Sequence, residues 1–245
     1  TGMTWSRGAA GLLVQTDALG NFVGLISLGK TERTVTDASG KTQTMNLYEY
    51  SGRAAATANT KEIGLKGVTA DAQWVIDNGY TQTYFDSNFT IQAVLQGTAP
   101  KGDALQQMSM TVQYLHDSVT GMTWSRGAAG LLVQTDALGN FVGMMALVKV
   151  ETKDAAGKIQ TQNQYGYVSR ADARAYTGEA KTLKGVTADA QWVINAGDTS
   201  IYFDSNFTIQ AVLGNTVSSF AGSGLEAGDI AFQQMASTVL YLHDS

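Results

Sequence analysis

The chain contains one sequence unit written twice. Residues Thr1–Gly24 recur without a change as Thr120–Gly143, and two further blocks are also repeated in full. These blocks are Leu65–Ile76, repeated as Leu183–Ile194, and Tyr84–Leu95, repeated as Tyr202–Leu213. Self-similarity at a fixed period predicts repeated structural units. We therefore expect one β unit over residues 1–119 and a second over residues 120–245, each long enough to have its own core.

The second copy is longer than the first near its end. Its extra nine residues fall in 214–228, a stretch rich in Gly and Ser that replaces Gln96–Lys101. Such a composition is typical of a loop.

Hydrophobic periodicity predicts strands in both copies. In Val68–Ile76 the apolar residues occupy alternate positions, and Tyr84–Leu95 follows a similar pattern with Phe85, Phe89 and Ile91 on one face. Alternation of this kind indicates a strand with one buried and one solvated face. We predict about six strands in each unit. In the first unit they are Met3–Thr16, Phe22–Thr34, Lys41–Tyr50, Leu65–Asp77, Thr81–Gln96 and Leu105–Asp117.

Short turns join these strands. Asp17–Asn21 and Asp37–Lys41, the latter matched by Asp154–Lys158, each place an Asp at the start and a Gly near the end. The Asp can accept from the turn backbone and the Gly tolerates a positive φ, so both predict tight hairpins. The Ala-rich segment Arg53–Thr60, with Arg170–Tyr176 in the second copy, predicts a turn of helix or a loop.

The expected fold is all-β, with two tandem homologous units that are each an antiparallel β-barrel or β-sandwich. The units join through Asp117–Gly121, which predicts a turn between closely joined units and no long linker. The opening Thr1-Gly-Met-Thr-Trp5, its following apolar strand and the Gly20–Gly24 hairpin resemble the first hairpin of avidin-type biotin-binding barrels. The resemblance covers about 24 of 119 residues and implies a shared way of starting a barrel. Tyr84 and Tyr114 stand where that family has tryptophan-bearing strands, so we assign no family from it.

Composition narrows the classes of partner. Charged residues make up 15% of the chain, the net charge is −5, and the Lys and Arg residues are scattered, which argues against a nucleic-acid partner. The chain has no Cys and no apolar run long enough for a membrane-spanning helix. Because it begins at Thr, we expect a processed product from which a secretion signal could already have been removed. Separately, we expect an extracellular or cell-surface location, in bacteria.

Exposed aromatic and short polar side chains are the candidate ligand-binding residues. Trp5 lies near a strand start beside Arg7, where a cation–π stack or an exposed platform is one reading and a structural role the other. Tyr with short acidic or amide side chains suits a carbohydrate-binding surface but also an ordinary solvated β face, and Tyr48 and Tyr50 share one face of their strand. The candidate set is Trp5, Tyr84, Asp86 and Asn88, with Trp124, Tyr202, Asp204 and Asn206 at the equivalent positions of the second copy. Trp74 shares the apolar phase of its strand and is expected in the core.

No catalytic residue, cofactor site or metal site is predicted. His116 and His243 are each followed by Asp, but no nucleophile motif accompanies them, and we interpret them as residues that close the end of the core. Asn88-Phe-Thr90 and Asn206-Phe-Thr208 match the N-glycosylation pattern within a predicted strand.

Three functional hypotheses follow. The first is a non-enzymatic structural or surface-assembly protein (an adhesin, sheath or filament component) that self-associates through the edge strands Met3–Thr16 and Leu105–Asp117. The second is a two-site carbohydrate- or small-ligand-binding module, lectin-like, with its aromatic residues exposed at matching places in both copies. The third, a barrel enzyme such as a cyclase, requires an internal cavity that the bulky side chains Trp74, Phe85, Phe89 and Tyr114 would fill.

Overall fold

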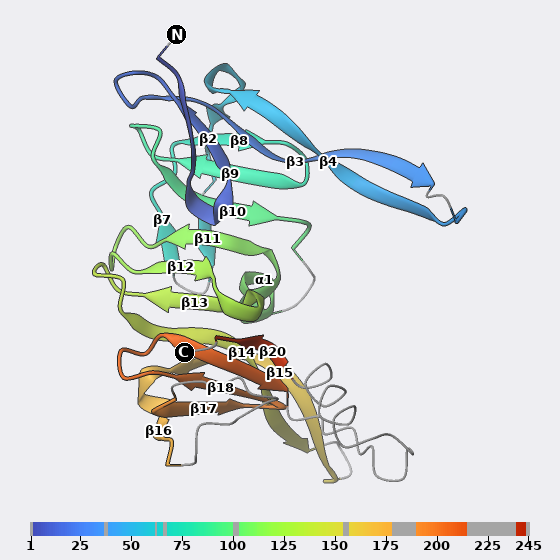
Figure 1. Ribbon diagram of the computed structural model, residues 1–245, viewed down its shortest axis with the longest axis vertical. Coiled ribbons are helices and arrows are strands. Elements are labelled where there is room, and N and C mark those ends of the chain that lie inside the picture. The colour runs from blue at the N-terminus through green and yellow to red at the C-terminus, as the bar shows by residue number, and fades with distance from the viewer. Residues whose placement is uncertain are drawn as a thin grey trace. The chain divides into compact units, whose positions relative to one another are not determined.

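The computed structural model describes residues 2–36, 39–61, 63–65, 68–99, 103–153, 157–177, 190–214 and 239–243. The described part is mostly strand, its ladders are antiparallel, and none of its sheets closes into a barrel (Figure 1). The all-β prediction is confirmed at that level. The chain divides into two compact units, Thr1–Arg126 and Gly127–Ser245.

The first unit contains a four-stranded sheet that consists of two successive hairpins. Its order is β1-β2-β3-β4. These strands are β1 Thr4–Arg7, β2 Leu13–Thr16, β3 Phe22–Thr36 and β4 Thr42–Gly52. Strands β3 and β4 extend beyond the others as a long two-stranded arm, which Figure 1 shows in blue. The predicted single strand Met3–Thr16 is wrong, because the 3-10 turn Ala9–Gly11 separates β1 from β2 with Ala10 and Gly11 at positive φ of 56° and 69°.

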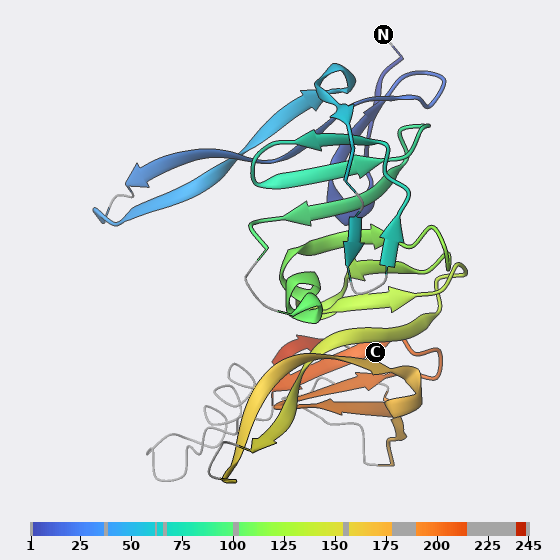
Figure 2. The same ribbon diagram turned by 180° about the vertical axis from the view of Figure 1, so that it is seen from behind.

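The remaining strands of the first unit form a second ladder. Within the unit its order is β12-β11-β10-β9-β8-β5. The strands are β5 Thr57–Ala58, β8 Trp74–Asp77, β9 Thr81–Phe85, β10 Ile91–Gln96, β11 Val112–His116 and β12 Thr123–Arg126. A small hairpin of β6 Ile63–Leu65 and β7 Val68–Ala70 contacts the helix α1, Ala104–Thr111, through β6 and contacts β11 through β7 (Figure 2).

The predicted strand Leu105–Asp117 is therefore wrong in its first half. The Asp103 carboxylate accepts a hydrogen bond from the Gln106 backbone N–H at 2.8 Å and caps α1. An Asp N-cap followed by Ala, Leu and Gln favours helix, and this local signal outweighs the alternating methionines. The prediction holds from Val112 onward.

The predicted strand Thr81–Gln96 is also wrong, because a turn at Asp86–Thr90 divides it into β9 and β10. The Asp86 carboxylate accepts from the backbone N–H groups of Asn88 and Thr90 at 2.9 and 2.8 Å. Phe89 then adopts a positive φ of 62°. Such Asx geometry competes with strand pairing. The predicted strand Leu65–Asp77 is similarly interrupted between β7 and β8.

Other turn predictions are confirmed. Asp17 accepts from the N–H groups of Leu19 and Asn21 at 2.9 Å each, and Gly20 has a φ of 83°. Asp117 accepts from the Val119 N–H at 3.0 Å, so β11 and β12 are joined by a tight turn. Arg53–Ala55 and Arg170–Asp172 are single 3-10 turns. Residues 37–38 and 154–156 of the other predicted turns lie outside the described part, as does the predicted loop 214–228 beyond Gly214.

The second unit repeats this arrangement in its described part. One ladder is formed by β13 Leu132–Thr135, β14 Phe141–Lys153 and β15 Ile159–Ser169. The other has the order β16-β17-β18-β19-β20, with β16 Arg174–Ala175, β17 Trp192–Ala196, β18 Thr199–Phe203, β19 Ile209–Gly214 and β20 Val239–Leu242.

An aromatic cluster joins the two ladders within each unit. In the second unit the Phe207 ring stacks on Phe141 and Trp192, with ring centroids 6.0 and 5.5 Å apart, and the Arg170 guanidinium lies 4.2 Å from its centroid. In the first unit Phe89 and Arg53 make the equivalent contact at 4.1 Å. The expectation that Trp74 packs in the core agrees with its stacking on Phe89 at 5.7 Å. Since Phe207 is 6% exposed, this cluster removes a large apolar area from water.

We expect Phe207→Ala to lower the free energy of unfolding by about 3 kcal/mol, because it leaves a cavity in this cluster. Arg170→Ala should cost about 0.5 kcal/mol, the value typical of an exposed cation–π contact. Urea unfolding measures both. Leu19→Ala is the control, because that side chain is 87% exposed, and it should leave the free energy of unfolding unchanged. Equal effects of Phe207→Ala and Leu19→Ala would contradict the assigned core.

The stability of the fold should depend on pH, because two hairpin carboxyls have a lowered pKa in the folded chain. Hydrogen bonds from the Asn21 side chain, and next from its backbone N–H, lower the pKa of Asp17 below its ordinary value of 3.8, and Asn140 does the same for Asp136. A carboxyl with a lower pKa in the folded chain stabilises the fold above its unfolded pKa and loses that contribution as pH falls through its folded pKa.

We therefore expect the unfolding midpoint to decline below pH 4, and to decline less steeply in the double variant Asp17→Asn, Asp136→Asn. Asn keeps the acceptor oxygen of the turn but does not titrate. Thermal unfolding between pH 2 and 7 makes the comparison, and identical pH profiles of the two proteins would refute this assignment.

Candidate functional site

One face of the β1–β4 sheet presents exposed aromatic and apolar side chains to solvent. Trp5, Tyr48 and Tyr50 are 44%, 73% and 53% exposed. Register places Arg7 opposite Leu13 and Leu13 opposite Ile26, so these side chains share the face. We call this surface the N-terminal face and define it by Trp5, Arg7, Leu13, Ile26, Tyr48 and Tyr50.

Local geometry holds its aromatic residues in place. The Tyr50 hydroxyl donates to Gln15 Oε1 at 3.1 Å, and the Tyr50 ring meets the edge of Trp5 with centroids 6.1 Å apart. Gly24 leaves space for this ring, since a Cβ there would lie 2.5 Å from the Tyr50 hydroxyl. Of the readings that the sequence left open for Trp5, a stack on Arg7 or an exposed platform, the structure shows an exposed ring in contact with Tyr50. The Arg7 guanidinium donates to the Gly11 carbonyl at 3.0 Å.

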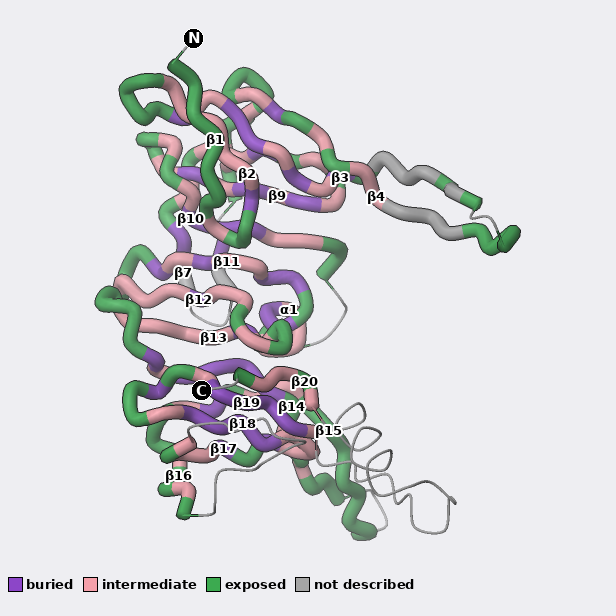
Figure 3. Tube along the Cα trace, viewed as in Figure 1, coloured by how far each residue is buried: buried purple, intermediate pink, exposed green. Residues whose placement is uncertain are grey.

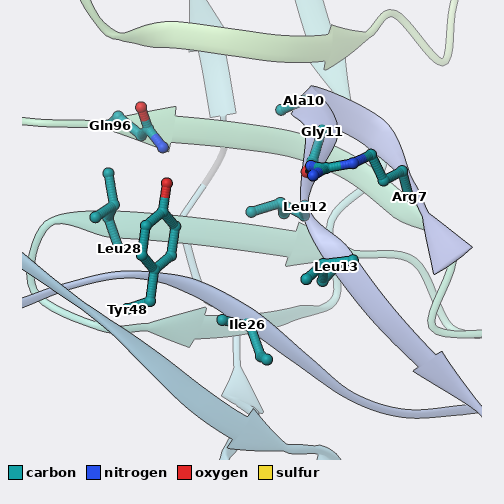
Figure 4. A pocket seen from close by; sticks show the side chains of 9 residues that line it. All are labelled: Arg7, Ala10, Gly11, Leu12, Leu13, Ile26, Leu28, Tyr48 and Gln96. Atoms are coloured by element: carbon teal, nitrogen blue, oxygen red, sulfur yellow. The ribbon is translucent and has the colours of Figure 1, made fainter. Parts of the chain in front are cut away.

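A pocket of about 480 Å³ opens beside this face (Figure 4). Its apolar lining comes from the turn between β1 and β2 (Ala10 and Leu12), from Leu13 of β2 and from Ile26 and Leu28 of β3. Arg7, Tyr48 and Gln96 add polar atoms around it. A concave surface with an apolar base and a few polar groups is suited to binding another molecule.

The equivalent residues of the second copy are buried to a different extent. Trp124 is 3% exposed where Trp5 is 44%, although both stand in the same Thr-Trp-Ser-Arg strand. Figure 3 shows β1 exposed along its length and β12 mostly of intermediate burial. The two strands have different neighbours, because β12 lies beside β11, with Trp124 opposite the fully buried Leu115. Arg126 correspondingly donates to the Ser109 carbonyl of α1 at 2.6 Å.

The other predicted ligand-binding residues lie apart from the N-terminal face along the chain and serve local structure. The Asp86 and Asp204 carboxylates both accept from their own turns, and Asn88 and Asn206 are exposed at the turn tips. Tyr84 donates to Gln82 at 3.2 Å, whereas Tyr202 is 6% exposed and packs edge-on against Tyr176. The two copies therefore do not expose their candidate Trp and Tyr at matching places, contrary to the prediction. The glycosylation-pattern residues Asn88 and Asn206 occupy turns, and not the predicted mid-strand positions.

Both histidines are hydrogen-bonded locally, His116 through its side chain and His243 through its backbone. His116 Nδ1 lies 3.2 Å from the Thr123 hydroxyl across the β11–β12 pair, and the His243 N–H donates to the Gln210 carbonyl at 2.8 Å. Within the described ranges no three His, Asp or Glu side chains gather as a metal site would need. The helix of the described part is too short to cross a membrane.

Sequence reasoning identified Trp5, Tyr48 and Tyr50 but missed Leu13 and Ile26 of the same face. Leu13 and Ile26 alternate with the core residues Val14 and Leu25, so the register between β2 and β3 was the signal that could have found them. A scan of protein-family models, a search of curated proteins and a search of solved structures each found no match to this chain.

The unequal burial of the two tryptophans predicts unequal fluorescence quenching. In dilute solution, Trp5→Phe should remove the fraction of emission most accessible to acrylamide, because that indole is the exposed one. Trp124→Phe is the matched control and should leave the quenchable fraction unchanged. The same loss of quenching in both variants would show that the two identical strands have the same environment.

Proposed function

We propose that this chain is a non-enzymatic structural protein that works outside the cell, as a component of a bacterial adhesin, sheath or filament. The observation that carries the proposal is the ladder between β11 and β12. It pairs the last strand of the first sequence copy with the first strand of the second, and Tyr114, Leu115 and His116 face Ser125, Trp124 and Thr123. Two sequence repeats joined by backbone pairing of their strands are what we expect in an assembly whose units contact one another directly, without a linker.

The fold that we infer for each repeat is a two-layer sandwich. Its support is the cluster of Phe22, Leu25, Ile76 and Phe85, which takes residues from both ladders of the first unit. A side-chain-filled interior favours a structural role over an enclosed substrate site, which the barrel-enzyme hypothesis requires.

Composition also favours association between molecules. Charged residues make up only 15% of the chain, so electrostatic repulsion between neighbouring molecules is weak. The exposed apolar residues of the N-terminal face add to this tendency, because apolar patches mark interaction sites.

A lectin-like binding module is the second candidate. The pocket beside Arg7 and Tyr48 favours it, because aromatic rings with a neighbouring guanidinium can bind a sugar or another small polar ligand. Trp124 and Tyr202 are buried, so that module would have one site on this chain and no avidity from duplication.

Light scattering coupled to size exclusion tests the assembly proposal. We expect the mass of the purified chain to rise above 26.0 kDa as its concentration increases, and electron microscopy of the largest species to show ordered polymers or rings. A clean monomer at every concentration would contradict the proposal and favour the binding module. A glycan and small-molecule screen with Tyr48→Ala as the negative control would then examine that alternative.

A further inference from the structure

The β11–β12 pair shows how one repeat of this sequence receives the next. Strand β12 lies against β11, with Trp124 opposite Leu115 and Thr123 opposite His116. In this pair Trp124 is 3% and Leu115 0% exposed. Two other strands of the chain correspond in sequence to β12 and β11.

The first of these strands is β1. It has the same four residues as β12, and β2 follows it as β13 follows β12. In the described part of the chain β1 is the end strand of its sheet, paired with β2 alone. All four of its residues are exposed.

The second is β20, which corresponds to β11. The segment Val239-Leu-Tyr-Leu-His243 differs from Val112-Gln-Tyr-Leu-His116 at one position, where Leu240 replaces Gln113. Its register on β19 pairs Ala211 with Leu242 and Val212 with Tyr241, the same pairing and bulge that β10 makes with β11. Among the described strands β20 is likewise an end strand, and Leu240 is 58% exposed.

One chain thus presents both halves of the joint that it already forms internally. We propose that β20 of one molecule pairs antiparallel with β1 of a second copy of this chain, in the register of β11 with β12. The predicted partners are Tyr241 with Ser6, Leu242 with Trp5 and His243 with Thr4. This inference rests on the proposed assembly function and names its interface.

The side chains at this joint fit that pairing. Trp5 gains the apolar neighbour that Leu115 provides to Trp124, and His243 gains the hydroxyl that Thr123 provides to His116 at 3.2 Å. Backbone groups on the outer edges of β1 and β20, which pair with no other described strand, gain hydrogen-bond partners in this joint. No covalent turn links the two strands here, so pairing depends on protein concentration.

Engineered cysteines test the register directly, because the natural chain has none. The variants Thr4→Cys and His243→Cys change exposed residues outside the core. Residues directly opposite each other in an antiparallel pair have Cα atoms about 4.5 or 5.5 Å apart, within the range that a disulfide spans. We expect the two variants, one of them isotope-labelled, to form a mixed disulfide after reduction, mixing and mild oxidation.

The matched control mixes His243→Cys with Leu19→Cys, which places an equally exposed thiol on a hairpin tip. We expect about tenfold more mixed disulfide from the Thr4→Cys pair, because docking raises the local concentration of those two thiols. Equal yields from the two mixtures would overturn the inference, as would a predominance of Thr4→Cys homodimers, which would show that β1 pairs with itself.

A second measurement separates the interface from the function. Trp5→Lys places a charge on the proposed edge, whereas Leu19→Lys places it on the hairpin tip. If Trp5→Lys loses the polymers and Leu19→Lys keeps them, the result supports the β1–β20 interface. Polymers that persist in Trp5→Lys, with no register-specific disulfide, overturn this interface but leave the assembly function standing. A wild-type chain that stays monomeric, together with no excess of mixed disulfide from the Thr4→Cys and His243→Cys mixture over its control, overturns both.

Discussion

The hydrogen-bonded ladder between β11 and β12 is the interaction on which the organisation of the chain depends. A strand at the edge of a sheet has backbone groups that must be satisfied by water or by another strand. Strand β12 meets this requirement by pairing with the preceding repeat. For that reason the compact units divide at residues 126 and 127, seven positions after the sequence copies divide, and the first strand of the second copy belongs structurally to the first unit.

Local chemistry fixes the remainder of each repeat. The same Asp-Ser-Asn-Phe-Thr turn produces a left-handed Phe in both units, with φ values of 62° and 61°. The turn directs the ring into a stack with Trp and Phe and under an Arg, and the two Arg contacts agree to within 0.1 Å. A residue in strained backbone geometry persists where its surroundings determine it strongly. Here the surroundings are aromatic side chains drawn from both ladders of the unit.

Much of this could be predicted from sequence, and the failures have physical causes. Alternation over Val68–Ile76 identified β8, and the Asp and Gly of Asp17–Asn21 identified a hairpin, because those signals are local. The break at Asp86–Thr90 was hidden because Phe85 and Phe89 keep the parity of an uninterrupted strand. The helix α1 was hidden because alternating methionines also suit a strand. Periodicity could not predict the burial of Trp124, because Trp5 has the same following sequence and is exposed. The two residues differ in their neighbours in space, since only Trp124 lies opposite Leu115.

The edge strands β1 and β20 differ in sequence, and this difference gives any array built through them a direction. A joint between unlike surfaces is heterologous, so it repeats without closing unless its rotation happens to form a ring. One end of an open array would present β1 and the other β20, and each would accept only the opposite strand. A chain with only one competent edge could then enter an array and terminate it. The length of such an array would be set by the ratio of complete to terminating chains, a form of control that needs neither a ruler protein nor an energy source.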